Sequence, residues 1–176
     1  MRQRLTKGII QVYYGTGKGK TTASLGLAFR ATGHGFKVHM IQFMKGEVNY
    51  GEIKASKNYP NIKITQFGRP ELIAEPEKVD IEEAKKALEL AKKTIEEDEY
   101  DIVILDEIGV AIEMGLIDVK DVIEVLKKKP PLMEIILTGR YMHPKLLEMA
   151  DLVTEMKMVK HPFVTQGLQA RKGVDF

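Results

Sequence analysis

The chain has 176 residues, of which 44% are hydrophobic and 30% charged, and its formal net charge is +2. This length predicts one globular domain, residues 1–176, with a substantial core. The near-neutral charge argues against a nucleic-acid or membrane-surface protein. The absence of cysteine excludes disulfides, thiolate metal sites and thiol catalysis. No apolar run approaches the roughly 20 residues of a membrane span, and no signal-peptide pattern is present, so we expect a cytoplasmic protein.

The first predicted strand leads directly into a glycine-rich loop. Residues 8–13 are rich in β-forming residues, and they are followed by Tyr14-Gly15-Thr16-Gly17-Lys18-Gly19-Lys20-Thr21-Thr22. Apolar residues after the loop predict a helix that ends near Gly33. A strand, a loop closing on Gly-Lys-Thr and a helix are typical of a P-loop. The first position differs, because a standard P-loop has glycine where this chain has Tyr14.

The residue types in this loop suit a polyphosphate ligand. Glycines let backbone N–H groups approach phosphate oxygens at the N-terminus of a helix. Lys20 would place its charge on the polyphosphate, and Thr21 would offer its hydroxyl to Mg²⁺. The alternative is a glycine-rich turn without a ligand. Residues 14–21 hold three glycines, two lysines and two threonines, which favours the phosphate site over a simple turn.

The rest of the chain alternates predicted strands and helices. Alternating or apolar runs predict further strands at residues 37–43, 62–67, 102–105, 135–137 and from 152. Apolar residues at spacings of three and four predict an amphipathic helix over residues 81–95. This order predicts an α/β three-layer sandwich with a mostly parallel sheet. Ligands of such sheets lie at the carboxyl ends of the strands.

Two carboxylates follow the predicted strand at residues 102–105. Asp106 and Glu107 stand where a Walker B carboxylate approaches the Mg²⁺ of a bound nucleotide. Alternatively, Asp106 caps the helix that begins near Ile108. The upstream P-loop favours a metal site made by Thr21, Asp106 and Glu107. Spacing alone does not decide which carboxylate is nearer the metal.

Basic residues later in the chain are further candidates for the same site. Arg140 follows the strand at 135–137 and should reach the same sheet edge, where a guanidinium suits phosphate, although a surface salt bridge is the alternative. Lys160 and His161 could line the site as well. The run Lys127-Lys128-Lys129 suits the C-terminal end of a helix, and the alternative is a binding patch.

In their order and spacing these residues resemble the ATP:corrinoid adenosyltransferases, P-loop NTPase-like proteins of the RecA-like type. The resemblance covers nearly the whole chain and rests on residues 15–22, 33–38, 42–46, 105–107, 137–140, 150–156, 160–161 and 167–176. Members of this family also lack the first glycine of the loop, so Tyr14 fits the family pattern.

The resemblance implies that ATP donates its 5′-deoxyadenosyl group to Co(I) of a reduced corrinoid and releases triphosphate. The product would be adenosylcobalamin, or the corresponding derivative of cobinamide or cobyrinic acid a,c-diamide. Co(I) is itself a strong nucleophile, so the reaction needs positioning and charge neutralisation, with no general base. The family further implies Mg²⁺ or Mn²⁺, a flavoprotein reductant, a homodimer, and ATP lying reversed in the loop.

The resemblance also assigns residues to these roles. Lys20, Thr21 and Glu107 would be catalytic. ATP would contact Gly15, Thr16, Gly17, Lys18, Gly19, Lys20, Thr21, Thr22, Arg140 and Lys160. The corrinoid would contact Lys45, Phe67 and Arg69. Some family members carry two aromatic residues after the third strand that help to displace the lower cobalt ligand. Phe67 matches the first of these, and Arg69 stands at the second.

Two other functions are weighed against this one. A P-loop phosphotransferase resembling a nucleoside kinase would use a base near its acceptor hydroxyl, and Glu107 could serve. A regulatory nucleotide-binding module acting on DNA is the second, and the near-neutral charge argues against it.

Overall fold

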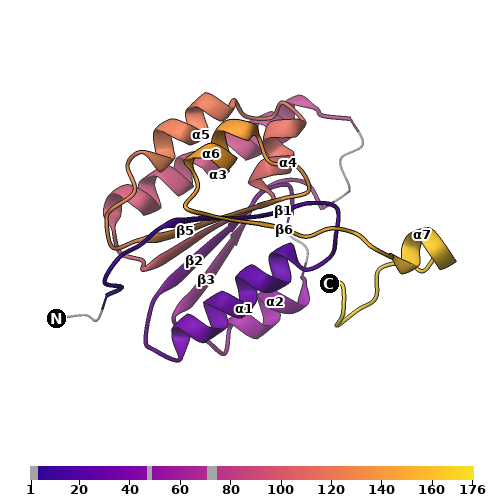
Figure 1. Ribbon diagram of the computed structural model, residues 1–176, viewed down its shortest axis with the longest axis horizontal. Helices are drawn as coiled ribbons and strands as arrows, with labels where there is room; N and C mark the ends of the chain where they lie inside the picture. Colours follow the sequence, from indigo (N-terminus) through magenta and orange to yellow (C-terminus); the bar gives the residue numbers. More distant parts are fainter. Residues whose placement is uncertain (1–3, 47–48, 71–74) are drawn as a thin grey trace.

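The computed structural model describes residues 4–46, 49–70 and 75–176, which build one six-stranded sheet with the order β3-β2-β4-β5-β1-β6 (Figure 1). All neighbouring strands pair in parallel. The strands are β1 (Ile10–Tyr14), β2 (Val38–Gln42), β3 (Ile62–Gln66), β4 (Ile102–Asp106), β5 (Glu134–Gly139) and β6 (Leu152–Glu155). The predicted parallel α/β sheet is therefore confirmed, and the predicted strands differ from these only at their ends.

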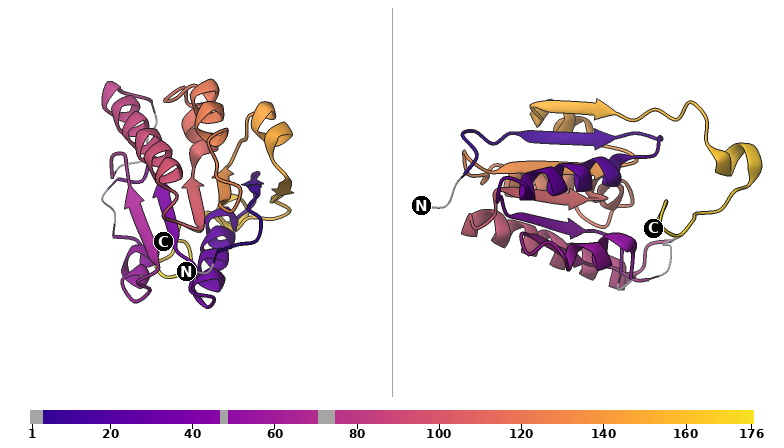
Figure 2. Two further views of the ribbon diagram at one scale, coloured as in Figure 1. Left: turned by 90° about the vertical axis from the view of Figure 1, so that its left-hand side faces the viewer. Right: turned by 90° about the horizontal axis from the view of Figure 1, so that it is seen from below.

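Helices cover both faces of the sheet, which gives the predicted three layers (Figures 1 and 2). One face carries α1 (Lys20–Thr32) and α2 (Gly51–Ser56). The opposite face carries α3 (Lys78–Glu97), α4 (Ile108–Glu113), α5 (Val119–Leu126) and α6 (Pro144–Met149). Helix α7 (Pro162–Gln166) stands away from these layers, and the chain after it returns toward α1 and α2. Among the described residues, no helix combines the length and apolarity needed to cross a bilayer.

The central strands are buried on both faces, as their apolar sequences predict. Every residue of β2, β4 and β5 is buried. The larger hydrophobic cluster joins the sheet to α3, α4, α5 and α6, and a smaller one joins it to α1. Because apolar burial on both faces is the main stabilising term, the sheet gives the loops at its carboxyl edge a rigid base.

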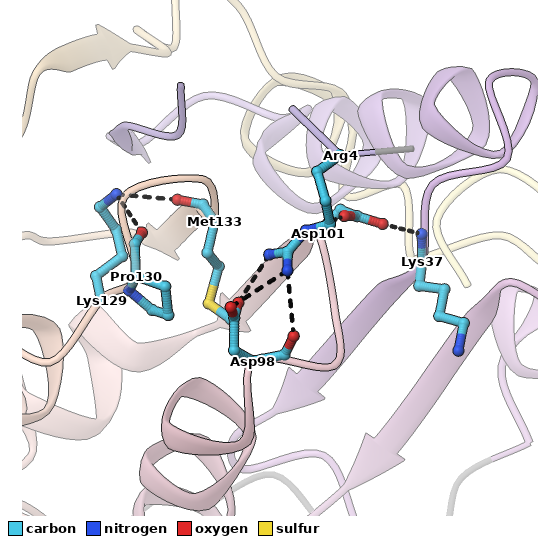
Figure 3. A network of polar contacts seen from close by, with 7 residues as sticks. All are labelled: Arg4, Lys37, Asp98, Asp101, Lys129, Pro130 and Met133. Carbon is cyan, nitrogen blue, oxygen red and sulfur yellow. Dashed lines mark hydrogen bonds and ion pairs between the residues drawn. The ribbon is translucent and has the colours of Figure 1, made fainter. Parts of the chain in front are cut away.

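A network of ion pairs ties the amino ends of the strands, the edge opposite the glycine-rich loop. Arg4 Nη2 lies 2.7 Å from Asp98 Oδ1, and Arg4 Nε lies 2.8 Å from Asp101 Oδ1 (Figure 3). Asp101 also accepts the N–H of Lys37, just before β2, at 2.8 Å. The network therefore connects the chain before β1 with the starts of β2 and β4.

The lysine run lies at the end of α5, and that prediction is confirmed. Lys127 is the residue after the helix and pairs with Glu124, while Lys128 pairs with Glu96. Lys129 Nζ donates to the carbonyls of Pro130 and Met133 (Figure 3) and to that of Gly8. Each of these lysines has a structural partner, so the run does not form a free cationic patch.

Buried His39 predicts a specific loss of stability in acid. It lies in β2, bonded to the hydroxyls of Thr65 and Thr94 at 2.9 and 3.2 Å. Burial, assisted by the charge of Lys63, lowers the pKa of His39 from 6.5 to about 4. As the pH falls, His39 therefore binds a proton near pH 6.5 in the unfolded chain but only near pH 4 in the folded chain. The free energy of unfolding should fall by about 3 kcal/mol across this window from His39 alone.

Urea unfolding of the native chain and of His39→Gln at pH 7, 5.5 and 4.5 measures this effect. The variant should be less stable at pH 7 but lose less stability on acidification. Equal pH slopes for the two proteins would contradict the prediction. The comparison cancels carboxylates that titrate in both proteins.

Candidate active site

The glycine-rich loop joins β1 to α1 at the carboxyl edge of the sheet, as predicted. Gly15 and Gly19 have φ of 112° and 118°, conformations that favour glycine. The Gly15 N–H donates to the carbonyl of Arg140 at 3.1 Å, and the Gly17 N–H donates to that of Met156 at 2.6 Å. The loop is thus fastened to the chain that follows β5 and to the chain that follows β6. The first N–H groups of α1 have no acceptor within the helix and lie at the end of this loop.

Tyr14 is the last residue of β1 and does not take part in the turn. It is paired in the sheet with Gly139 and Glu155, and its carbonyl accepts the N–H of Met156 at 2.7 Å. Its side chain packs against the larger core cluster. The turn therefore begins at Gly15, and the missing first glycine leaves the geometry of residues 15–19 intact.

If the loop holds the phosphates as the sequence predicts, Gly17→Ala should weaken binding of Mg·ATP at least about tenfold, because the phosphate groups would rely on the loop backbone for their contacts. A Cβ on Gly17 would meet the Met156 carbonyl oxygen at 2.6 Å, so the loop or the chain after β6 must move. Titration calorimetry with Mg·ATP measures the change. Gly26→Ala in α1 is the matched control, since its Cβ would meet nothing within 4 Å. Native affinity in Gly17→Ala would show that the loop tolerates the displacement.

Lys20 lies folded over the loop that it follows. Its Nζ donates to the carbonyls of Gly15 and Gly17 at 2.9 and 2.8 Å. Burial lowers the pKa of Lys20, and the charge of Arg140 adds to this, while Glu107 and Asp106 oppose it. The ammonium group therefore sits at the centre of the loop, surrounded by the charged groups that the sequence analysis selected.

Asp106 is fully buried at the end of β4 and is the centre of a polar cluster. Its Oδ1 accepts the hydroxyls of Thr21 at 2.9 Å and Thr138 at 2.8 Å. Its Oδ2 accepts Lys45 Nζ at 2.6 Å and Gln42 Nε2 at 3.2 Å. The carboxylate thus joins the P-loop helix to three strand ends. The alternative that Asp106 caps α4 is wrong, because the residue preceding that helix is Glu107.

Glu107 occupies a strained position next to this cluster. Its φ is 64°, unusual for a residue with a side chain, and its N–H donates to Thr138 Oγ1 at 2.9 Å. Burial and then the charge of Asp106 raise the pKa of Glu107, while Lys45 and Lys20 partly counter them. Backbone strain of this kind occurs often at functional sites.

The oxygen atoms around Asp106 fit Mg²⁺. A hydroxyl and a carboxylate are hard donors, and the Mg²⁺ of a P-loop takes one or two protein ligands and completes its shell with phosphate and water. Thr21 and Asp106 provide such a pair, with Glu107 beside it. Among the described residues there is no group of three or more His, Cys, Asp and Glu side chains placed to hold a metal.

The ion pair between Lys45 and Asp106 was not predicted from the sequence. Burial acts to lower the pKa of Lys45, but the charge and hydrogen bond of Asp106 outweigh it, and the pKa is raised. Sequence reasoning assigned Lys45 to the corrinoid. The structure pairs the Lys45 ammonium with Asp106, the carboxylate selected for the metal, and the contact with the corrinoid stays a prediction.

Two cavities adjoin the loop. One, of about 770 Å³, is lined by Thr16, Gly17, Lys18 and Lys20 and by parts of the chain after β6, including Lys160, His161 and Arg171. Lys160 is therefore beside the P-loop, as expected. The other, of about 650 Å³, is lined by Thr21, Thr22, Lys45 and Glu107, and by the aromatic side chains of Phe29, Tyr50, Tyr59 and Phe176.

The remaining candidates lie around these cavities in different settings. Arg140 is exposed after β5, close enough for its charge to affect the pKa of Lys20. Phe67 follows β3, packs against the larger core cluster and accepts the Lys45 N–H at 2.8 Å. Arg69 is held elsewhere, because its Nε and Nη2 bond to the two carboxylate oxygens of Asp80 at 2.8 and 2.7 Å. Asp80 belongs to the capping box that starts α3.

The chain is similar in sequence to known proteins over nearly its whole length. The sequence profile of the ATP:corrinoid adenosyltransferase family BtuR/CobO/CobP matches residues 6–176. A corrinoid adenosyltransferase of Sinorhizobium sp is 39% identical over 174 residues, covering 97% of this chain and 81% of that protein. Those of Escherichia coli strain K12 and Salmonella typhimurium are 34% and 33% identical over 173 residues, covering 97% of this chain and 86% of each relative.

Proposed function

The chain belongs to the ATP:corrinoid adenosyltransferase family, and from this membership we propose that it transfers the 5′-deoxyadenosyl group of ATP to Co(I) of a reduced corrinoid, releasing inorganic triphosphate. The site residues selected from the sequence carry the steps of this proposal. We further propose that residues 1–176 act as one domain, in the cytoplasm, with a flavoprotein or similar reductant supplying Co(I).

The observation that supports this proposal best is the placement of cations around the P-loop. Lysine and arginine side chains that line the larger cavity are Lys18, Lys20, Lys157, Lys160 and Arg171. A triphosphate group carries several negative charges, and charged side chains in a partly enclosed site bind it more strongly than in open water. We propose that this cavity and the loop hold the triphosphate portion of ATP.

The residues of the chain would promote the reaction by orienting the two reactants and by stabilising the negative charge on the leaving triphosphate. In the reaction the cobalt electron pair forms the Co–C5′ bond, the C5′–O bond breaks, and its electrons leave with the triphosphate. No proton moves, so no general base is required. Lys20, Lys18 and the loop N–H groups would stabilise the charge that gathers on the leaving group. Mg²⁺ held beside Thr21 and Asp106, with Glu107 near it, would add positive charge there.

We propose that the corrinoid approaches from the ends of β2 and β3. Phe67 and Lys45 lie side by side there, and Lys45 connects them to Asp106. Arg69 stands where some family members have a second aromatic residue, and its bidentate bond to Asp80 makes it a support for α3. On this proposal, Phe67 contacts the corrinoid and Arg69 acts indirectly by fixing the start of α3.

A homodimer is proposed on the exposed apolar surface of the last strand and the segment after it. Leu152 and Val153 of edge strand β6 are 38% and 43% exposed, and Val159 is 92% exposed. Phe163 and Val164 of α7 are exposed as well. Apolar side chains gathered on one segment are typical of an interaction surface. Multi-angle light scattering should give twice the chain mass, and a monomer at micromolar concentration would refute the dimer.

The decisive experiment measures the phosphate product. Folded protein with ATP, Mg²⁺ and chemically reduced cobalamin should yield adenosylcobalamin and one equivalent of inorganic triphosphate, separated by chromatography. ADP with a phosphorylated acceptor would instead indicate the phosphotransferase. Absence of the adenosylated product from folded protein, with reduced cobinamide as well as cobalamin, would refute the proposal.

A further inference from the structure

The last six residues fold back onto the P-loop, far from their neighbours in sequence. Lys18 Nζ forms an ion pair with the carboxylate of Asp175 and donates to the Val174 carbonyl at 3.0 Å. The chain returns there after α7 has carried it away from the sheet (Figure 2). We call residues 171–176 the tail. The tail therefore binds the ammonium group of Lys18, the exposed lysine of the loop.

The tail is a compact turn with its own internal bonds. Asp175 Oδ2 accepts the N–H of Arg171 at 2.8 Å, and the Asp175 N–H donates to the Arg171 carbonyl at 2.8 Å. At its end, the ring of Phe176 meets that of Tyr50 edge-on, with centroids 6.5 Å apart. One carboxylate thus shapes the turn and also fastens it to Lys18.

Asp175 lines both cavities beside the loop, so the tail forms the wall between them. On one side lie Thr21, Lys45 and Glu107 of the metal cluster. On the other side lie the cations of the larger cavity. Among the described residues that line this cavity, Asp175 is the one with an acidic side chain. A polyphosphate on the loop would therefore meet the tail at this carboxylate.

The ion pair and a polyphosphate require the same ammonium group. Lys18 is 47% exposed and Asp175 is 23% exposed, so their pair is held in a partly solvated setting and is weak. A triphosphate brings several negative charges and would repel Asp175 while it attracts Lys18. The two anions cannot both keep close contact with Lys18, and the more highly charged one should displace the other.

We propose that Asp175 occupies Lys18 in the ligand-free protein, and that a polyphosphate displaces this carboxylate from Lys18 and so releases the tail from the loop. The tail then acts as a latch that opens on triphosphate binding and joins the two cavities. The inference rests on the proposed use of the loop for triphosphate. Its tests use inorganic triphosphate alone, so they stay valid if adenosyl transfer fails.

Tail movement can be followed with one substitution, because the chain contains no tryptophan. Phe176→Trp places a single reporter at the contact with Tyr50. Mg²⁺ with inorganic triphosphate should shift its emission to longer wavelength and increase quenching by acrylamide. Adding Lys18→Gln should produce the released spectrum without any ligand. An unchanged or blue-shifted emission on triphosphate binding would overturn the latch.

Affinity supplies the second test. Asp175→Asn removes the competing charge, so the dissociation constant of Mg·triphosphate should fall about two- to fivefold, the range of an exposed ion pair. Asp175→Glu keeps the carboxylate and should restore native affinity. Asp121→Asn, on α5, is the matched control for removal of one negative charge. Equal or weaker binding by Asp175→Asn would show that Asp175 does not compete with the ligand.

Discussion

Lys20→Ala is expected to lower kcat/KM for adenosyl transfer by about a hundred- to a thousandfold, the loss typical when one preorganised charge is removed from a developing anion. Lys20 Nζ sits between two loop carbonyls at 2.8 and 2.9 Å, at the point where the triphosphate would lie. The negative charge on the leaving group grows in the transition state, so most of the loss should appear in kcat.

Steady-state rates of adenosylcobalamin formation measure the effect of Lys20→Ala. Lys120→Ala, on the exposed side of α5, controls for loss of one cation and should behave as the native chain. Thermal unfolding should give nearly native stability for both variants, since the hydrogen bonds that the described residues give Lys20 go to loop carbonyls. A loss in kcat smaller than about tenfold would exclude Lys20 as the main stabiliser of the leaving group.

Asp106→Ala is expected to damage both stability and activity. The substitution leaves Lys45 Nζ without the carboxylate oxygen at 2.6 Å, and it removes the shared acceptor of Thr21 and Thr138. Removing one partner of a buried ion pair costs about 3–5 kcal/mol. Denaturant unfolding should show a loss of this size, and adenosyl transfer should fall at least about a hundredfold where the protein remains folded.

A double variant separates the two effects of Asp106. Asp106→Ala combined with Lys45→Met removes the unpaired cation, so part of the lost stability should return. Activity should not return, because the oxygen donor beside Thr21 is still missing. Recovery of activity in the double variant would mean that Asp106 serves only to neutralise Lys45.

The features that sequence predicted well are those encoded locally or by the sheet. The P-loop is a contiguous pattern, and residues 102–105 are apolar enough to identify a buried strand. Because parallel strands end at one edge, Asp106 could be placed near Thr21 although 85 positions separate them. Helices α2, α6 and α7 were not predicted, since five or six residues are too few to show a helical period.

The contacts that sequence did not predict come from side chains and loops with no periodic signal. Nothing in the sequence pairs Lys45 with Asp106, because the choice depends on how the chain leaves β2. The contact between Met156 and Gly17 was not predictable for a similar reason, because it depends on the path of the chain after β6. Asp175 is 157 positions from Lys18, and only the return of the chain after α7 brings them together.

The fastening of the glycine loop to residues after β6 has a consequence for biosynthesis. Strand β1 lies between β5 and β6, and Thr16 bonds to the N–H of Met158, 142 positions later. A ribosome makes about 5–20 residues each second, and units with such distant contacts complete late. The phosphate loop is therefore synthesised well before the residues that fasten it, Met156 and Met158. A growing chain would acquire full nucleotide affinity only after the residues that follow β6 have been translated and have paired with the loop.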